Sequence, residues 1–519
     1  MRKIIQFCAI AVLLAFPSVG RSQFTFITNN GAITITGYIG SDGLVVIPAM
    51  TNGYPVTSIG AKAFYQDSYL TNIIIPNGVI TIGDFAFVYT ALSIITIPDS
   101  ITSIGNGVFW NCGGLRSVII GNSVTNIGTS ADPVGVFGLT ALTNVTIPNS
   151  VISIGSAAFE CSLTNITLGT NVTTIGDYSF SGSSLASITL PSSVTAIGNK
   201  AFSLCSRLKS ATIGTGLTTI GTNAFYECAS LTNATILGSV PNFGDGAFYG
   251  CSNLTSLTLG NGVSTIGNAA FQYCTKLTSV TIPDSVTNIG NNTFYGDYFL
   301  TNVTLPNTLS SIGNGVFNGC QNLTNLTLPQ GITSIGSSAF STCYSLSSLI
   351  IPNSVTSIGT NAFYFCGILT TITIPSSVTN LADDAFFNCF KLAGIYFSGN
   401  APELGSAVFG NYFGVSNTIP TIFYLPGSAG WDEKFGGRPT VLWNPQAQTS
   451  DNSFGVQTNK FGFNIIGNDN VVFVVEASTN LVNPIWQALG TYTLSNAPVY
   501  FSDAQWTNYP GRYYRFRSP

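Results

Sequence analysis

The chain repeats one pattern of apolar and polar residues about every 23 residues, and the copy at Cys274–Gly296 shows it most clearly. Leu277, Val280 and Ile282 lie two or three residues apart, and the last two alternate with polar residues as in a β-strand. A proline follows, apolar positions resume, a glycine marks a turn, and Phe294 closes the copy. One such copy cannot bury its own apolar residues, so copies must stack and share a continuous core. The pattern therefore predicts a solenoid.

Three columns of residues keep a common register along the chain. Turn residues recur from Gly60 to Gly405 at 16 positions, and their spacing settles to 23 residues from Gly198 onwards. A leucine column and a phenylalanine column, the latter from Phe64 to Phe409, follow the same spacing. We predict a β-rich solenoid of about 16 coils of 23 residues, in which parallel strands lie about 4.8 Å apart. Each A-F-x-x-C segment is predicted to form a short helical turn.

The two ends of the repeat region need caps, because the first and last coils expose core residues. Residues 23–54 alternate apolar and polar positions around an Asn-Gly pair, which predicts an N-terminal β-hairpin cap before repeats at 55–410. Residues 411–446 break the period and bring bulky side chains, which predicts a C-terminal cap and linker. Short β-like runs at 447–519 predict a small β-sandwich.

The repeated phrase L-x-x-V-T-I-P-x-S-V-T-x-I-G-x-x-A-F-x-x-C resembles the BspA-like, or Treponema pallidum-type, leucine-rich repeat. The resemblance covers about residues 55–410 and is specific, because many tandem copies carry it. It implies a right-handed leucine-rich-repeat solenoid and a role in adhesion or protein recognition, as in surface and secreted bacterial proteins. It carries over no particular binding residue, since family members differ at exposed positions.

The N-terminus has the layout of a cleaved secretory signal at 1–22. Two basic residues, Arg2 and Lys3, precede an apolar run from Ile4 to Phe16, and small residues follow. A membrane anchor is the alternative, but the run is shorter than the ~20 residues that a span needs. We expect a secreted or cell-surface protein with no membrane span in the mature chain.

Composition excludes several classes of function. Charged residues are only 7% of the chain, and 16 Lys and Arg against 20 Asp and Glu leave no basic patch for nucleic acid. The chain has no histidine, which removes Ser-His-Asp and Cys-His catalysis and His-containing zinc sites. We predict that the protein is not an enzyme, and we predict no catalytic, cofactor-binding or metal-binding residue and no cofactor.

Most of the cysteines fall three residues after the phenylalanine, and they form a column rather than a metal motif. Stacked coils and an exported location would allow disulfides between neighbours. Parallel side chains in register keep their Cβ atoms too far apart for easy bonding. We therefore favour free, buried thiols, with disulfides as the alternative.

Two exposed columns remain as candidate binding surfaces. An aromatic row follows the phenylalanine column and is the preferred surface for a protein partner, the alternative being that its rings only cover the edge. Its members are Tyr65, Trp110, Tyr226, Tyr249, Tyr295 and Tyr364, with Tyr273 one position later. Outward threonines of the main strands, together with a second outward row of Ser and Asn, form a hydroxyl and amide grid on the expected concave side. Packing alone explains such stacked threonines, but the grid could also meet a glycan or an ordered surface. Its members are Thr235, Thr258, Thr281, Thr304 and Thr327.

These features predict a monomeric, non-catalytic surface protein for adhesion or protein–protein recognition. Its partner is expected to be an extracellular or surface protein, or a polysaccharide, and not nucleic acid. The alternative functions are a structural component of the cell envelope and a glycan or ordered-surface binder that uses the threonine grid.

Overall fold

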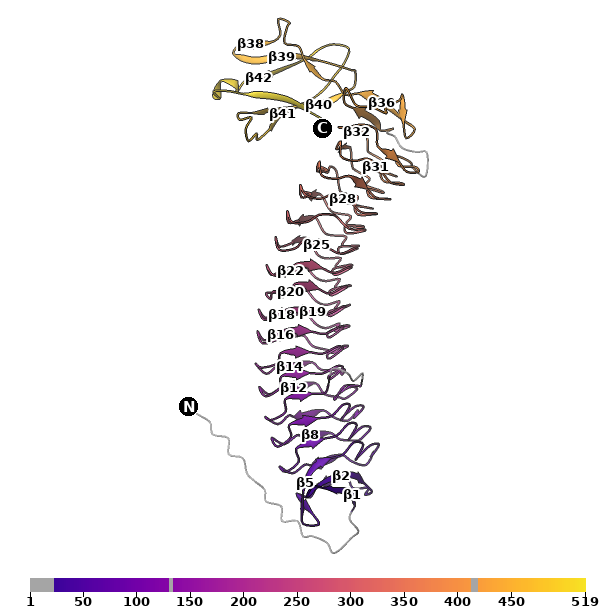
Figure 1. Cartoon of the computed structure of the whole chain (residues 1–519), viewed down its shortest axis with the longest axis vertical. Helices are drawn as coiled ribbons and strands as arrows, with labels where there is room; N and C mark the ends of the chain where they lie inside the picture. The colour runs from indigo at the N-terminus through magenta and orange to yellow at the C-terminus, as the bar shows by residue number, and fades with distance from the viewer. Residues whose placement is uncertain (1–22, 130–133, 412–418) are drawn as a thin grey trace.

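The computed structural model describes residues 23–129, 134–411 and 419–519, so the predicted signal at 1–22 lies outside the described residues. Each coil contributes two short strands and a turn segment, and the coils stack into a long column (Figure 1). The predicted β-solenoid is confirmed, with about 17 turns of about 23 residues. The domain boundaries given above stay predictions.

The first strand of each coil, called the main strand, comes from the L-x-x-V-x-I segment. Neighbouring main strands pair in parallel and in register, as Thr212 with Thr235 and Thr235 with Thr258. Figure 1 shows several of them, such as β12 and β22, along the left side of the column. The main strands are β3 (Leu44–Val46), β6 (Asn72–Ile74), β8 (Ile94–Thr96), β10 (Ser117–Ile119), β12 (Asn144–Thr146), β14 (Asn165–Thr167), β16 (Ser187–Leu190), β18 (Ser210–Ile213), β20 (Asn233–Ile236), β22 (Ser256–Leu259), β24 (Ser279–Thr281), β26 (Asn302–Thr304), β27 (Asn325–Leu326), β30 (Thr371–Ile374), β32 (Gly394–Phe397), β34 (Thr421–Tyr424) and β36 (Arg438–Leu442).

The second strand of each coil comes from the V-x-x-I-G segment and is usually two residues long. These strands also pair in parallel, and the N-terminal part of the series belongs to a 14-stranded sheet. The second strands are β5 (Tyr54–Ile59), β7 (Thr81–Ile82), β9 (Ser103–Ile104), β11 (Asn126–Ile127), β13 (Ser153–Ile154), β15 (Thr174–Ile175), β17 (Ala196–Ile197), β19 (Thr219–Ile220), β21 (Asn242–Phe243), β23 (Thr265–Ile266), β25 (Asn288–Ile289), β28 (Ser334–Ile335), β29 (Ser357–Ile358), β31 (Asn380–Leu381) and β33 (Glu403–Leu404).

The segment from the turn glycine to the cysteine forms hydrogen-bonded turns, so the predicted short helical turn is wrong. In the first coil, Lys62 and Gln66 have φ values of 58° and 62°, and such left-handed residues interrupt a right-handed helix. The backbone N–H groups instead alternate in direction. Those of Ala63 and Tyr65 bond within the coil, whereas those of Lys62 and Phe64 bond to the next coil. We call this side of the column the turn edge.

A continuous stack of phenylalanine rings fills the core. Neighbouring rings from Phe64 to Phe409 lie with centroids 4.9 Å (Phe225–Phe248) to 6.1 Å (Phe386–Phe409) apart, and their planes are close to parallel. The leucine column and the inward valines and isoleucines of both strands are buried beside them. The ring planes repeat once per coil, so the core extends without widening.

The cysteine column joins neighbouring coils by hydrogen bonds. The Sγ atom of Cys251 donates to the carbonyl of Phe225 at 3.2 Å, and Cys274 donates to Phe248 in the same way. All ten cysteines of the described residues are free, and Cys389 is the one that is not fully buried. Burial raises the pKa of the Cys251 thiol, which keeps it protonated as a donor.

The N-terminal end of the column is covered by a hairpin. Strands β1 (Phe24–Asn29) and β2 (Ala32–Tyr38) pair antiparallel, and β2 then pairs in parallel with β5. The Tyr38 ring lies 5.7 Å from that of Phe64 and so extends the ring stack by one member. Strand β4 (Met50–Thr51) pairs with the start of β5.

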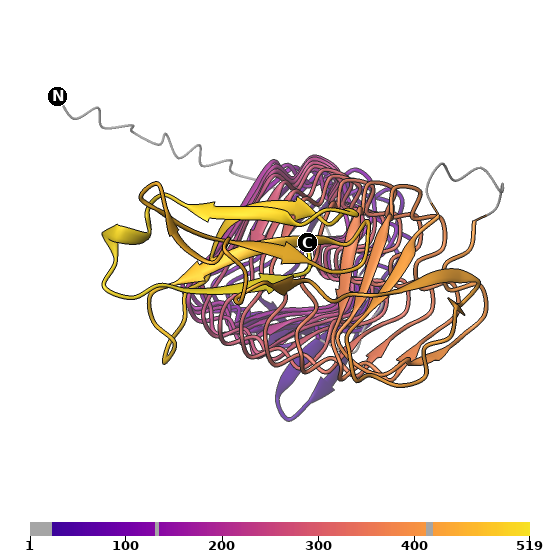
Figure 2. The ribbon, with the colours of Figure 1, turned by 90° about the horizontal axis from the view of Figure 1, so that it is seen from above.

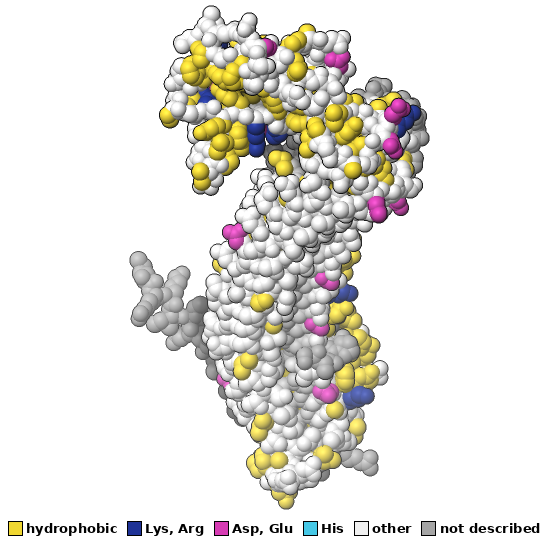
Figure 3. Space-filling model, turned by 45° about the horizontal axis from the view of Figure 1, so that its top comes forward, with side chains coloured by type: hydrophobic (Ala, Val, Ile, Leu, Met, Phe, Trp, Pro, Cys, Tyr) yellow, Lys and Arg dark blue, Asp and Glu magenta, His cyan; other side chains and the backbone are white. Residues whose placement is uncertain are grey.

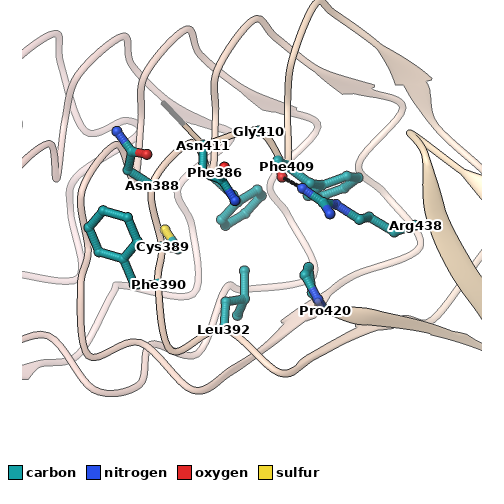
Figure 4. Close-up of a pocket in the computed structure, with 10 residues that line it drawn as sticks. All are labelled: Phe386, Asn388, Cys389, Phe390, Leu392, Phe409, Gly410, Asn411, Pro420 and Arg438. Carbon is teal, nitrogen blue, oxygen red and sulfur yellow. Dashed lines mark hydrogen bonds between the residues drawn. The ribbon is translucent and has the colours of Figure 1, made fainter. Parts of the chain in front are cut away.

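Aromatic and basic side chains cover the C-terminal end. Trp431 lies 4.9 Å from the rings of both Phe397 and Phe435, the latter in β35 (Lys434–Phe435). Arg438 donates to the carbonyl of Phe409, as Figure 4 shows, in a small pocket of the last coil. In inner coils the equivalent phenylalanine carbonyl accepts a hydrogen bond from the cysteine of the following coil, as that of Phe363 does from Cys389. Arg438 supplies the donor where the repeats end.

Beyond the cap, two antiparallel sheets form the module predicted as a β-sandwich. Their inward side chains, among them Phe463, Val475 and Phe501, share one core. Figure 2 shows this module displaced to one side of the column axis. One sheet contains β37 (Gln446–Ala447), β38 (Gly455–Gln457), β39 (Lys460–Ile466) and β42 (Val499–Asp503), and the other contains β40 (Val472–Ser478), β41 (Gln487–Thr493) and β43 (Tyr513–Arg517); a 3-10 helix, η1 (Trp506–Asn508), follows β42.

Candidate partner-binding surfaces

The predicted aromatic row lies on the turn edge, but it does not form one continuous strip. The structure divides it into an N-terminal cluster, a middle cluster and a C-terminal cluster, each of which also contains rings from the next sequence position. Figure 3 shows hydrophobic side chains gathered along the right-hand edge of the lower half of the column. The predicted partner-binding role of these residues stays a prediction.

The middle cluster is the longest run and spans four consecutive coils. Tyr226 and Tyr249 stack with centroids 5.1 Å apart. Tyr273 then meets Tyr249 at 5.6 Å and Tyr295 at 5.5 Å, both edge to face. All four side chains are half-buried. They therefore present ring surface and hydroxyl groups together, on a backbone fixed by the bonds between coils.

Glycine makes room for these rings. A Cβ atom at Gly296 would lie 2.6 Å from Cδ1 of Tyr273, and Gly296 has a φ of +73°. The Tyr273 ring thus lies flat against the backbone of the next coil. Burial raises the pKa of Tyr249 and of Tyr295, so both hydroxyls remain protonated donors over a wide pH range.

The N-terminal cluster contains Tyr65 and Trp110, which do not touch each other directly. Tyr89 lies between them, 6.2 Å from Tyr65 and 5.3 Å from Trp110. Lys62 places its Nζ atom 5.7 Å from the Tyr65 ring centroid, which adds a cation–π contact. The cluster therefore combines aromatic rings with a positive charge.

The C-terminal cluster forms around Tyr364. Its ring lies 4.9 Å from Phe365 and 5.8 Å from Phe387, and Phe365 in turn meets Phe390 at 5.5 Å. These phenylalanines and Tyr89 are not among the residues predicted from the sequence. The signal was present, because Tyr89 and Phe365, like Tyr273, come two residues after the core phenylalanine, where φ is positive and the side chain points out.

The predicted threonine grid lies on the outward side of the main strands, called here the main-strand face. Thr258, Thr281, Thr304 and Thr327 are exposed there, and Thr235 is half-buried. Thr281 pairs in register with Thr304, so neighbouring hydroxyl groups repeat once per coil. No charged residue belongs to this row from Thr235 to Thr373, and its members are threonines except for Ile350, which is 82% exposed. The row therefore offers neutral hydroxyl groups with one aliphatic interruption.

The grid changes character at both ends of the column. Near the N-terminus some outward positions are aliphatic: Ile74 and Ile119 are 51% and 56% exposed, on either side of Thr96. Near the C-terminus, Tyr396 and Phe423 take the threonine positions, in register with Thr373, and they belong to the core of the C-terminal module. The module thus packs onto the main-strand face, and Ser518 bonds to Thr373 at 2.9 Å.

No cluster of three or more Cys, Asp or Glu side chains that could hold a metal ion occurs in the described ranges. Within those same ranges, no helix is long and apolar enough to cross a membrane.

The repeat region matches the model of a known protein family. The model of the BspA type leucine rich repeat region matches in overlapping segments at 49–131, 133–255, 173–301, 242–346 and 287–416. No curated protein matches the chain.

Several solved structures resemble the chain. A leucine-rich repeat protein from Bacteroides ovatus is 28% identical, with a TM-score of 0.57 over 73% of this chain and 94% of that one. A leucine rich cell surface protein from Faecalibacterium prausnitzii is 27% identical over 74% and 96%, with a TM-score of 0.35. The Leucine Rich Repeat protein of T. pallidum is 18% identical over 64% and 91%, with a TM-score of 0.21. With the family model matching well over half of the residues, the chain belongs to the BspA-type leucine-rich repeat proteins.

Proposed function

We propose that this chain is an exported, non-catalytic surface protein that recognises another protein through its turn edge. The middle cluster of Tyr226, Tyr249, Tyr273 and Tyr295 carries the proposal, because its rings are in contact yet only half-buried. Tyrosine supplies contact area and a hydrogen-bonding tip at little cost in side-chain entropy, as in protein hot spots. Export is supported by the signal-like segment at 1–22.

The rigidity of the edge favours recognition over packing alone. The backbone N–H groups of Tyr273 and Gly296 bond to the next coil at 2.9 Å and 2.8 Å, so the rings stand on a fixed frame. A partner that binds such a preorganised surface loses less conformational entropy than one that must order a loop. Adhesion is the cellular role that fits a surface protein of this kind.

The test replaces all four tyrosines of the middle cluster by serine in the secreted chain. Binding to a panel of purified extracellular proteins would be measured by surface plasmon resonance, beside a glycan array. We expect at least a tenfold loss for any partner of this edge, since a few aromatic anchors dominate most interfaces. The matched control replaces Tyr500 and Tyr513, which are exposed tyrosines of the C-terminal module, by serine and should leave binding unchanged. Unchanged binding in the middle-cluster variant would move the site elsewhere.

A second candidate function is binding of a glycan by the threonine grid, and the exposure of Thr258, Thr281 and Thr304 favours it. Replacement of these three residues by alanine should then remove signals on the glycan array. The same change should leave protein partners of the turn edge unaffected.

A further inference from the structure

The joint between the C-terminal module and the last coils contains a hollow of about 150 Å³. Stacked rings of Tyr396 and Phe423, with centroids 4.7 Å apart, line it together with Trp443 and Phe516. Its polar lining comes from Ser398, Arg517 and Ser518. Pockets of this composition, mainly aromatic with a few polar groups, are typical of ligand sites between domains.

The Tyr396 hydroxyl is the feature that packing does not explain. The Tyr396 side chain is 4% exposed, and its hydroxyl has no hydrogen-bond partner among the described residues. Phe423 occupies the neighbouring position of the same row and buries a ring without any hydroxyl. The hydroxyl borders the open hollow, so it is free to form a hydrogen bond with a group that enters there.

Tyr396 reaches the hollow because its own strand leaves room for the ring. A Cβ atom at Gly394, two residues earlier on the same side of β32, would lie 3.0 Å from the Tyr396 ring and 3.3 Å from its hydroxyl. All other coils with a described main strand carry a larger residue there, as Thr371 does in the preceding coil. The ring therefore lies across the main-strand face with the hydroxyl at one end.

Arg517 adds a positively charged group to the lining, and not all of its N–H donors are hydrogen-bonded. Its Nε donates to Glu476 at 2.7 Å and one Nη donates to the carbonyl of Ser518, which leaves three of its five N–H groups without an acceptor among the described residues. Arg515 also pairs with Glu476, at 2.7 Å, so two guanidinium groups share one carboxylate. Figure 3 shows Lys or Arg side chains in the recess below the module.

We propose that this hollow binds one sugar residue that carries a carboxylate, such as a uronic acid unit of an acidic polysaccharide. The size fits, since a cavity of about 150 Å³ holds a six-membered ring such as benzene. The aromatic walls face the ring, the hydroxyls of Tyr396 and Ser518 meet sugar hydroxyls, and Arg517 pairs with the carboxylate. An acidic peptide side chain has the carboxylate but no ring to fill the aromatic hollow.

The test titrates the full chain with D-glucuronic acid and, as the neutral probe, with methyl glucoside, and follows binding by saturation-transfer NMR. We expect binding of the acid and weak or no binding of the glucoside. Tyr396→Phe keeps the ring and removes only the hydroxyl, so we expect about tenfold weaker binding, the loss of one hydrogen bond. Tyr500→Phe makes the same chemical change at an exposed site of the module and should leave affinity unchanged.

Each outcome decides the proposal. Equal binding of both probes would overturn the role of the carboxylate, and unaltered affinity in Tyr396→Phe would overturn the site. The unfolding midpoint of Tyr396→Phe should stay within about 2 °C of the parent, which separates lost binding from lost fold. The middle tyrosine cluster lies on the turn edge, so its test can fail without affecting this one.

Discussion

Asp297 occupies the cysteine column between Cys274 and Cys320, and replacing it by cysteine should stabilise the protein. The Asp297 side chain is fully buried, and neither carboxyl oxygen has a hydrogen-bond partner among the described residues. In the neighbouring coil, Cys320 donates to the carbonyl of Phe294 at 3.2 Å. Asp297→Cys would place a thiol in the same position relative to Phe271.

The expected gain has two parts. Removing a buried polar group without a partner returns about 1–3 kcal/mol, and a weak thiol hydrogen bond adds about 0.5 kcal/mol. We therefore expect about 2 kcal/mol of added stability at acidic pH, where the carboxyl is protonated in both states. Thr90 and Ser183 fill equivalent positions in other coils and bond to the following cysteine at 3.2 Å, which shows that short side chains fit.

The gain should grow as pH rises. Burial holds the pKa of Asp297 well above its usual range in the folded state, so the unfolded chain loses its proton first. The free energy of unfolding of the parent is therefore highest below about pH 3.9, the pKa of the Asp297 carboxyl in the unfolded chain. It falls as the pH rises toward the pKa of that carboxyl in the folded protein. The slope is at most about 1.4 kcal/mol per pH unit. Between pH 5 and pH 7 the variant should gain up to about 2.7 kcal/mol more over the parent.

Guanidinium unfolding at pH 4 to 8 measures this difference, and hydrogen exchange at the amides of Asp297 and Leu300 reports the local coil, because repeats can open separately. Asp284→Asn changes an exposed carboxylate in the same coil and should shift stability by less than about 0.5 kcal/mol. A gain that does not depend on pH, or no gain at all, would refute the reasoning.

Three further predictions follow from the coil geometry. Gly296→Ala should destabilise the protein by about 1–2 kcal/mol in guanidinium unfolding, because it strains a positive φ and displaces Tyr273, whereas Gly367→Ala, with open space around it, should be neutral. Thiol labelling of the native protein should modify Cys389 first, and full modification of all ten described cysteines should require denaturant. Rapid labelling of all ten without denaturant would contradict their burial. Arg438→Gln should leave the Phe409 carbonyl without its donor and raise hydrogen exchange in the last coil by about tenfold, with inner coils unchanged.

The spacing of residues was sufficient to predict the solenoid, because every coil repeats the same buried columns. The turn segment was mispredicted because its left-handed positions hold residues as different as Lys62, Gln66 and Tyr89, and none of them identifies a positive φ as glycine would. The aromatic row was found, but its division into clusters depends on which neighbouring coils carry a ring and which carry glycine. Such contacts between coils are visible only when the stacking register is known.

The packing of the C-terminal module on the main-strand face could not be predicted either, because it brings together residues that are far apart in the sequence. Tyr396 and Phe423 replace threonine at the end of the grid, and from sequence alone they suggest only a variant coil. Their partners Phe463 and Phe501 belong to another domain. A row that is hydroxyl-rich in the middle and aromatic at one end therefore serves two purposes. The aromatic end fixes the module in place, and this leaves the neutral middle and the separate turn edge as the parts of the column open to partners.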